Sequence, residues 1–352
     1  MQEQHTDMRK PLPISSMDVA RRAGVSQSTV SKVANNSASL TTETRMRVIS
    51  AARELGYALT PRKSGYRVAV IVPEQRFVGY IADMLSGLSQ EILDRGMSME
   101  IITDRRLSLL NERCVEGAIG LTWMDHFYAE WAKTMIIPLV RINGQSNHLK
   151  NCWSVYPNGI HSLQVLVDRL WNLGHRKIAF FFFNSKEHEI KNVARRLDGF
   201  LLAMQSHGVE DAEQYCLFNC LQREGEVLSE QLIAWHREGV TAVIFSNGLG
   251  TGKMMQCLQL SGLKVPQDIS IVGWEQQYFS AYTIPALSTL YPDPKLFAKA
   301  AVTLLIKMIE HHRNLRDVLL PYRWIERDSI GYAPGCQRAE ADALERADSA
   351  DR

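Results

Sequence analysis

From about residue 68 onward, short apolar runs alternate with amphipathic segments of helical length, and this alternation constrains the fold more than any other feature. Residues 68–72 have the length and composition of a buried strand, and residues 80–95 form a helical pattern that ends at Gly96. Strands that alternate with helices favour parallel sheets covered by helices on both faces. The sequence therefore predicts an α/β body. The further expected strands cover residues 99–103, 118–121, 136–141, 177–183, 240–246 and 269–273, and the further helices cover residues 161–173, 193–207 and 253–260.

The length of 352 residues suits two ordinary domains and one small module. The longest apolar runs, such as residues 178–183 and 240–245, are far shorter than the roughly 20 residues of a membrane-spanning helix. Residues 1–15 show no apolar segment followed by a small-residue cleavage site, so we expect a cytoplasmic protein without a membrane segment. Six scattered cysteines match neither a disulfide framework nor a zinc pattern, which predicts reduced core thiols and no metal.

Charge is distributed unevenly along the chain. Residues 9–67 contain eleven basic and three acidic side chains, a net charge of +8, whereas the rest of the chain totals −6 and the whole chain +2. A small basic module on a mildly acidic body favours a polyanionic partner, because lysine and arginine contacts to phosphates release condensed counterions. On charge alone, a solvated basic surface is an equally good interpretation.

Residues 16–33 supply the motif that decides between these interpretations. Ser16 is placed to cap a first short helix, Gly24 suits a tight turn at positive φ, and Ser26 is spaced to cap a second helix. Ala20, Gly24 and Val30 occupy the small, turn and apolar positions that let two helices cross closely. A third helix is expected to begin with Thr42 as its cap and to end at Gly56. The pattern predicts a helix-turn-helix within three helices.

This amino-terminal region resembles the headpiece of the lactose repressor and galactose repressor (LacI/GalR) family of bacterial transcription regulators. The resemblance rests on residues 18–20, 23–26, 29–33 and 54–57, which read DVA, AGVS, TVSKV and ELGY. It implies that the helix opened by Ser26 lies in the major groove of an operator. Glutamine suits adenine, lysine reaches guanine acceptors and hydroxyls suit phosphates. The expected base readers are Gln27, Ser28 and Lys32, and the expected backbone contacts are Ser16, Ser26, Thr29, Ser31 and Asn35.

The linker after the headpiece departs from the family pattern. Most members carry a longer connection with a hinge helix whose leucine inserts into the minor groove. Here only residues 58–67 separate Tyr57 from the first strand, and they contain Pro61 and Gly65, so a full hinge helix is not expected. We expect a plain tether in which Arg62, Lys63 and Arg67 contact phosphates, and Leu59 as an intercalating wedge is the alternative.

The resemblance extends over the body and about 310 residues in all. Residues 172–179, 196–200 and 265–273 match the strand entry, the Arg-x-x-Gly-Phe segment and the final strand of the family's second lobe. The implied fold is that of periplasmic sugar-binding proteins, with an effector between two lobes. The expected organisation is a flexible tail at 1–14, a headpiece at 15–57, a linker at 58–67, a two-lobed body at 68–333 and a flexible tail at 334–352. Lobe 1 is assigned to about 68–160 plus 291–325, and lobe 2 to about 161–290.

The family's effector residues carry over only in part. Arg196 and Asn247 stand at matching positions, Glu275 replaces an aspartate, and Tyr291 lies near the usual glutamine. The aspartate that usually follows the asparagine is Gly248 here, so a free-sugar inducer is less firmly implied than the fold. The alternatives are a structural salt bridge for Arg196 and a solvated turn for Glu275. A phosphorylated or acidic effector also fits, because the helix near Lys253 begins with exposed amides.

Catalytic readings of the body are unsupported. Residues 248–253 follow a strand, but a phosphate loop needs glycine where Asn247 stands and a hydroxyl where Met254 stands. His175 fits a helix-to-strand connector better than a catalytic base. We therefore expect no enzyme activity and no cofactor. Because two headpieces must address two half-sites of an inverted repeat, a homodimer is expected. The leading hypothesis is a repressor controlled by a sugar or sugar derivative, and the alternative is a ligand-insensitive DNA-binding dimer.

Overall fold

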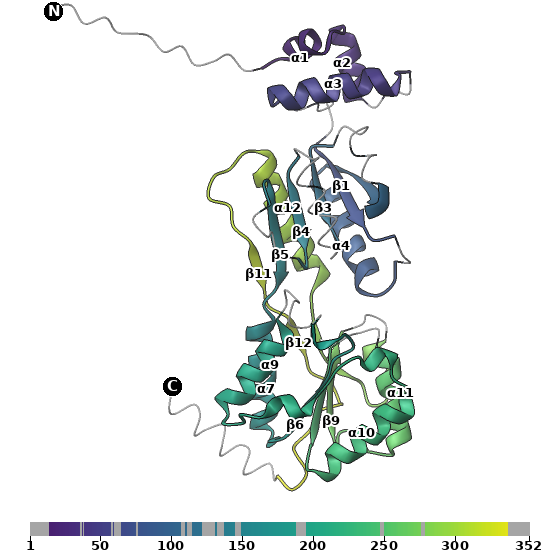
Figure 1. The fold of residues 1–352 in the computed structure, drawn as a ribbon, viewed down its shortest axis with the longest axis vertical. Helices are drawn as coiled ribbons and strands as arrows, with labels where there is room; N and C mark the ends of the chain where they lie inside the picture. The colour runs from purple at the N-terminus through teal and green to yellow at the C-terminus, as the bar shows by residue number, and fades with distance from the viewer. Residues whose placement is uncertain are drawn as a thin grey trace, which may run out of the picture.

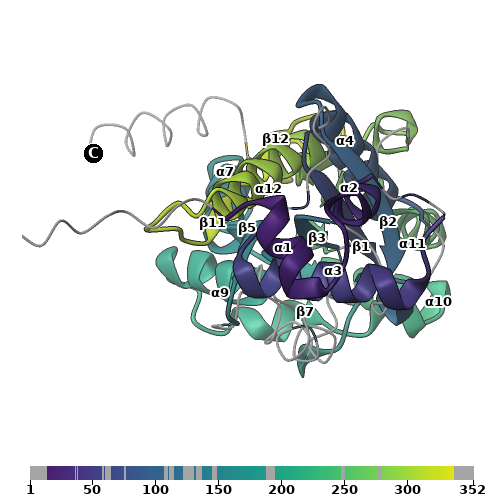
Figure 2. The same cartoon turned by 90° about the horizontal axis from the view of Figure 1, so that it is seen from above.

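The computed structural model contains three units, a small helical headpiece and two α/β lobes (Figure 1). The headpiece stands next to lobe 1, and lobe 2 lies at the other end of the molecule. Seen from above, the headpiece helices lie over lobe 1 (Figure 2). The structure describes residues 14–35, 37, 39–57, 59, 65–74, 77–106, 110, 115–121, 131, 137–144, 149–187, 195–246, 250–275 and 279–336.

The headpiece consists of α1 (Ser16–Ala23), α2 (Gln27–Ala34) and α3 (Thr42–Leu55). Gly24 ends α1 with φ of 65° and Gly56 ends α3 with φ of 66°, which confirms both expected glycine stops. Ser26 caps α2 as expected, and its hydroxyl accepts a hydrogen bond from the Thr29 amide at 3.2 Å. The apolar faces of the three helices form one core, made of Val19, Ala20, Ala23, Val30, Val33, Ala34, Val48, Ile49, Ala51, Ala52 and Leu59.

Two caps lie one residue earlier than the sequence suggested. Ser15, not Ser16, caps α1, because its hydroxyl accepts from the Asp18 amide while the Asp18 carboxylate accepts from the Ser15 amide. This reciprocal pair is a capping box. Thr41, not Thr42, caps α3 through a hydrogen bond from the Thr44 amide at 3.3 Å. Ser16 is thereby freed for another contact.

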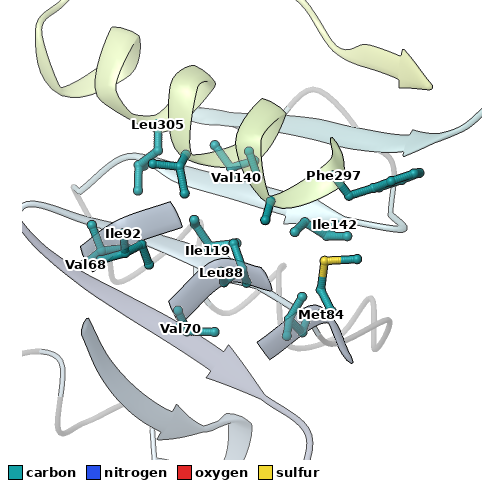
Figure 3. Close-up of a cluster of buried hydrophobic side chains, with 14 of the residues drawn as sticks. Val68, Val70, Met84, Leu88, Ile92, Ile119, Val140, Ile142, Phe297 and Leu305 are labelled. Atoms are coloured by element: carbon teal, nitrogen blue, oxygen red, sulfur yellow. The ribbon is translucent and has the colours of Figure 1, made fainter. Parts of the chain in front are cut away.

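Lobe 1 is a six-stranded sheet in the order β11-β5-β4-β3-β1-β2. Every residue of β1 is buried, as expected for a central strand covered on both faces. Helices α4 and α12 cover one face and meet the side chains of β1, β3 and β4 (Figure 3). The elements are β1 (Arg67–Val72), α4 (Tyr80–Asp94), β2 (Ser98–Thr103), β3 (Gly117–Gly120), β4 (Leu139–Ile142), β5 (Cys152–Pro157), α12 (Pro294–Ile309) and β11 (Val318–Leu320).

Lobe 2 is a second six-stranded sheet in the order β12-β10-β9-β8-β6-β7. Phe180 and Phe182 point to the face covered by α7 and α9, whereas Phe181 and Phe183 point to the face covered by α10 and α11. The run of four phenylalanines is therefore a buried strand and its continuation. The elements are α7 (Gly159–Asn172), β6 (Ile178–Phe181), α9 (Arg196–Ser206), β7 (Cys216–Leu217), α10 (Gly225–Arg237), β8 (Ala242–Phe245), α11 (Thr251–Ser261), β9 (Ser270–Trp274), β10 (Ser288–Tyr291) and β12 (Arg323–Ile325).

Three connections between the lobes orient the two sheets. The chain leaves lobe 1 after β5, returns after β10 and leaves again after β11. The chain crosses to the other lobe directly after β5 and after β10, so both strands end at the boundary between the lobes. Strand β4 is parallel to β5, and β9 is parallel to β10, so β4 and β9 also end at this boundary. The carboxyl ends of the parallel strands of both sheets therefore face each other, and this is where α/β sheets bind ligands.

The lobe boundaries differ from those expected at the last connection. Residues 291–325 were assigned to lobe 1, but β12 pairs with β10 in the sheet of lobe 2. This pairing is antiparallel and adds an edge strand to the otherwise parallel sheet. The following segment also belongs to lobe 2, because the Ile271 amide donates to the Ser329 carbonyl and the Ala333 amide to the Leu173 carbonyl, both at 2.8 Å. The sequence did not predict β12, because the strand has only three residues and its partner, β10, lies far away in the chain.

Buried thiols and one buried histidine behave as structural groups. Burial raises the pKa of Cys152, Cys220 and Cys257 to about 12, which leaves these thiols protonated and unreactive. His175 is fully buried between the Thr241 hydroxyl, at 2.8 Å from Nδ1, and the Gly331 carbonyl, at 3.0 Å from Nε2. Cys114 lies outside the described residues. Among the helices that the structure describes, none combines the length and apolar character required to cross a bilayer.

Candidate nucleic-acid interface and inter-lobe site

Helix α2 presents one polar face to solvent and packs the other into the headpiece core. Gln27, Ser28, Ser31 and Lys32 are exposed, whereas Val30 and Val33 are buried. This division follows from the helical period, because buried residues three apart lie on one side of the helix. The side chains expected to read base edges therefore point away from the core, and Ser26 and Asn35 are exposed at the two ends of the helix.

The polar groups at the start of α2 are already ordered by mutual hydrogen bonds. The Ser26 hydroxyl lies 2.8 Å from the hydroxyl of Ser28 and 2.8 Å from that of the half-buried Thr29. The first turn of a helix carries unpaired amides and the positive end of the helix dipole, both of which favour an anion. Ser26, Ser28 and Thr29 thus place three hydroxyls at the positive end of the α2 dipole.

Ser16 connects α1 to the expected base reader Gln27. The Gln27 Nε2 donates to the Ser16 hydroxyl at 2.8 Å, and both residues are on the solvent side of the headpiece. This contact fixes the direction of the glutamine side chain before any ligand is present. At the other end of α2, the Asn35 Nδ2 donates to the Ser31 carbonyl at 2.8 Å, which caps the carboxyl end of the helix. Arg62 and Lys63 lie outside the described residues.

Arg196 lies at the inter-lobe side of lobe 2. It is the first residue of α9, and its Nη1 donates to the Ser246 carbonyl at 2.7 Å, directly after β8. Its guanidinium carbon lies 5.5 Å from the centre of the Trp274 ring, at the end of β9. A guanidinium over an indole face is a cation–π contact. Arg196 is therefore held at the carboxyl ends of two neighbouring strands. Asn247 follows Ser246 and lies outside the described residues.

Glu275 is paired inside lobe 2 and is not a solvated turn residue. Its carboxylate accepts hydrogen bonds from Arg327, with an Nη1 to Oε2 distance of 2.9 Å, and from the Thr289 hydroxyl. The Glu275 side chain is 6% exposed and that of Arg327 18% exposed. The expected effector carboxylate thus already has a cationic partner, which lowers its availability for sugar hydroxyls.

The remaining inter-lobe residues come from both sheets. Tyr291 ends β10 beside Arg323 of β12 and is half-buried. From lobe 1, Tyr80 begins α4 and Asn143 follows β4. Burial raises the pKa of the Tyr80 phenol. The phenol is therefore neutral and acts only as a hydrogen-bonding group.

The structure adds two residues that the sequence did not single out. Trp274 precedes Glu275 in the chain and carries the ring against which Arg196 packs. Its position before Glu275 was a usable signal. Arg327 pairs with Glu275 across 52 positions, and nothing in the local sequence of either residue announces this pair. Residues brought together by strand order can be identified only once β10 and β12 are known to be neighbours.

Two family models match this chain. The model described as "Bacterial regulatory proteins, lacI family" matches residues 17–59 and coincides with the headpiece. The model described as "Periplasmic binding protein-like domain" matches residues 167–330 and covers most of lobe 2 with the connections back to lobe 1. The two matches place a lacI-type DNA-binding domain before a periplasmic binding protein-like domain, in the order that the amino-acid pattern implies.

Several curated relatives share the whole architecture. The ribose operon repressor of Haemophilus influenzae is 27% identical over 331 residues, which cover 89% of this chain and 97% of that protein. The MalR transcriptional regulator of Streptomyces coelicolor is 27% identical and covers 83% of this chain and 89% of its own length. The PurR repressor of Proteus mirabilis is 25% identical, with 90% and 97% covered. All three are transcriptional regulators.

Solved structures show the same fold over the full length. A complex of the transcriptional regulator CelR with cellobiose has a TM-score of 0.64 at 24% identity and covers 90% of this chain and all of that one. A lac repressor dimer bound to operator and an anti-inducer has a TM-score of 0.61 at 23% identity, with 91% and 99% covered. The shared fold extends over about nine tenths of this chain in both comparisons. The chain therefore carries the DNA-binding domain of the lacI family of bacterial regulatory proteins, at residues 17–59, followed by a periplasmic binding protein-like domain.

Proposed function

We propose that this chain is a sequence-specific transcriptional repressor that binds an inverted-repeat operator as a homodimer and responds to a sugar or sugar derivative. The observation that carries the proposal is the polar face of α2, where exposed Gln27, Ser28 and Lys32 stand on a buried apolar face. The basic balance of residues 9–67 supplies the attraction to phosphate that such a face requires. When bound to its operator, the protein would be associated with the nucleoid in the cytoplasm.

In this proposal, Gln27, Ser28 and Lys32 read base edges in the major groove. Ser16, Ser26, Thr29, Ser31 and Asn35 position the helix on the phosphate backbone, and Arg62 and Lys63 add phosphate contacts from the linker. The Gln27 amide leaves Ser16 when it pairs with a base, or keeps that hydrogen bond and uses its carbonyl. The hydroxyls around Ser26 donate hydrogen bonds to a phosphate at the amino end of α2.

Selection of duplexes from a random library tests the DNA-binding part. We expect the enriched duplexes to contain two half-sites related by a twofold axis, and to bind far more tightly than random competitor at 0.15 M salt. Enrichment of no sequence at that salt concentration would refute the proposal. A search of the source genome for the enriched sequence, checked by footprinting with the protein, would then locate the target genes. The functions of these genes would suggest the ligand.

The effector is proposed to bind between the lobes, where the carboxyl ends of both sheets meet. Arg196, held against the buried Trp274 ring, would donate to effector oxygens, and Tyr291 and Asn247 would add polar contacts. A relative named as the ribose operon repressor, and a structural neighbour in complex with cellobiose, support a carbohydrate. A ligand regulates only if it binds one arrangement of the lobes better than another.

A ligand-insensitive DNA-binding dimer is the second candidate, and the ion pair of Glu275 with Arg327 favours it. A carboxylate that is already paired offers less to sugar hydroxyls. Thermal-shift measurements with neutral sugars, sugar phosphates and sugar acids distinguish the two. A ligand that binds only the folded state adds RT ln(1 + [L]/Kd) to the free energy of unfolding, and the melting temperature rises as a result. A rise that Arg196→Met abolishes supports the inter-lobe site, and no rise with any class supports the second candidate.

A further inference from the structure

Arg67 is buried and is not the exposed phosphate contact that the linker sequence suggested. It is the first residue of β1 in lobe 1, yet its side chain reaches into the headpiece. Its Nη1 donates to the Ala34 carbonyl at 2.9 Å, and its Nη2 donates to the Leu59 carbonyl at 2.9 Å. Ala34 is the last residue of α2, the helix proposed to enter the major groove. A guanidinium at this end satisfies a carbonyl that the helix leaves unpaired and complements the negative end of the helix dipole.

Glu116 holds Arg67 in place from within lobe 1. The Arg67 amide donates to the Glu116 Oε2 at 2.7 Å, and the Arg67 Nη2 lies 3.7 Å from the Glu116 Oε1. The two side chains are only 8% and 7% exposed. A buried ion pair of this kind fixes the relative position of its two side chains but adds little to the free energy of unfolding, because both ions lose their hydration. Removing one partner alone would leave an unpaired buried charge.

The linker is anchored at both of its ends. Leu59 is part of the headpiece core, and the Tyr66 carbonyl accepts from the Ser98 amide at 3.0 Å in lobe 1. A side chain at Gly65 would meet the Gly96 carbonyl at 2.5 Å, so this segment lies tightly against the turn before β2. From Leu59 to Gly65 the chain can span at most about 20 Å when fully extended. The linker therefore limits how far the headpiece can move from lobe 1, and the contacts of Arg67 hold it within that limit.

A second contact supports the same arrangement. The Arg53 Nη2, near the end of α3, donates to the carbonyl of Leu110 in lobe 1 at 3.4 Å. At the same time, Gln27, Ser28 and Lys32 remain exposed. The docked headpiece thus leaves its proposed reading face open, which distinguishes this arrangement from an autoinhibited one.

We propose that Arg67 is a positioning residue for operator recognition, which fixes the carboxyl end of α2 to the first strand of lobe 1 so that headpiece and lobe 1 turn together. This inference rests on the proposed function, because it assumes that α2 reads DNA. It assigns to one buried arginine the coupling for which most family members use a longer linker. In a dimer, the distance between the two reading helices then follows the distance between the two copies of lobe 1.

The main test compares two double variants that remove equal charges. Arg67→Met with Glu116→Gln removes the buried pair without leaving an unpaired ion, and the glutamine side chain introduced at position 116 can still accept from the amide of residue 67. Arg95→Met with Glu91→Gln is the control, because this partly buried pair lies in lobe 1 and involves α4, away from the headpiece. Each protein is titrated with the selected inverted repeat, with a single half-site, and with repeats whose half-sites are moved apart by one or two base pairs.

We expect the Arg67→Met, Glu116→Gln variant to bind the inverted repeat about tenfold or more weakly, because a mobile headpiece lowers the effective concentration of the second half-site. Its affinity for the single half-site should be unchanged, and its preference for one spacing should be lost. The control should match the wild type in all three respects. Unchanged spacing preference in the Arg67→Met, Glu116→Gln variant would overturn the inference. A wild-type protein that prefers no duplex would instead refute the proposed function.

Motion of the headpiece provides a readout that needs no DNA. In the wild type, ¹⁵N relaxation of the headpiece amides should give the rotational correlation time of the whole molecule, and in the Arg67→Met, Glu116→Gln variant a much shorter one. A short correlation time in the wild type would overturn the inference even if that variant failed to fold. Arg67→Lys should be intermediate, because an ammonium cannot donate to two carbonyls with the fixed geometry of a guanidinium.

Discussion

At the residue scale, specificity and affinity are expected to reside in different side chains. Lys32 is exposed on α2 where base edges are expected, whereas Arg62 lies in the linker. Lys32→Ala should relax base preference at one position of each half-site, at a cost of about 1–3 kcal/mol for the preferred base. Arg62→Ala should weaken all duplexes alike and lower the slope of log K against log salt by about 1.

Binding isotherms at several salt concentrations, on the selected duplex and on single-base variants of it, separate these two behaviours. If Lys32→Ala weakens every duplex equally, Lys32 is a phosphate contact and the base readers reduce to Gln27 and Ser28.

His175 gives the folded chain a defined pH dependence. Burial lowers the pKa of this imidazole to about 4, from an ordinary value of 6.5. Between these values the unfolded chain binds a proton that the folded chain does not, so stability is lost as the pH falls from about 6.5 toward 4. From pH 7 to pH 5 the loss amounts to about 2 kcal/mol at 1.36 kcal/mol for each unit. Urea unfolding at both pH values measures it.

His175→Gln is the matched variant for this prediction. Glutamine can donate to the Gly331 carbonyl and accept from the Thr241 hydroxyl, but it does not titrate. The variant should be less stable than the wild type at pH 7 and should lose less stability on acidification, by about 2 kcal/mol. Equal losses in the two proteins would show that His175 is protonated in the folded state.

At the scale of elements, the positions of caps decide how the headpiece is built. Ser15→Ala removes both hydrogen bonds that its hydroxyl makes with Asp18, and loss of an amino-terminal cap costs about 1 kcal/mol. Ser16→Ala leaves this cap intact and instead releases Gln27. Thermal unfolding should therefore shift for Ser15→Ala, whereas DNA affinity should change for Ser16→Ala at nearly unchanged stability. The reverse result would place the cap at Ser16.

Helix ends that depend on neighbouring residues could be predicted from the sequence, whereas features that depend on residues far away in the chain could not. Gly24, Ser26 and Gly56 act on their own neighbours, and the helix ends they indicate agree with the structure. The cap of α1 was misplaced by one residue because two adjacent serines offer the same hydroxyl. Only the reciprocal hydrogen bonds with Asp18 distinguish them. The choice between two adjacent serines as the cap depends on backbone geometry, which the amino-acid pattern does not contain.

The candidate sites divide in the same way. The reading face of α2 is one helix long, so its period alone indicates which side chains are exposed. The inter-lobe site is assembled from strands that are neighbours only in space, and the pairing of Glu275 with Arg327 depends on the edge strand β12. The same holds for Arg67, whose partners Ala34 and Glu116 lie 33 and 49 positions away.

At the scale of the whole molecule, the proposed homodimer requires an apolar surface that a second copy can cover. The segment after β9 carries three exposed large side chains, namely Phe279, Tyr282 and Ile284, with exposed fractions of 40%, 78% and 92%. Contiguous exposed apolar side chains are rare on monomers and mark interaction surfaces. The segment belongs to lobe 2, at the end of the molecule remote from the headpiece. A contact there would join the copies without covering α2.

Ile284→Asp places a charge in this surface and should weaken the dimer by about tenfold or more, because burying an unpaired carboxylate is costly. Sedimentation equilibrium over a range of concentrations measures the dissociation constant. Leu202→Asp is the control, since Leu202 is 50% exposed on α9 and lies outside the segment. An effect of equal size in both variants would mean that residues 279–284 are not the dimer contact. With Ile284→Asp, DNA affinity should fall at protein concentrations where only monomer remains, and binding to a single half-site should be unchanged.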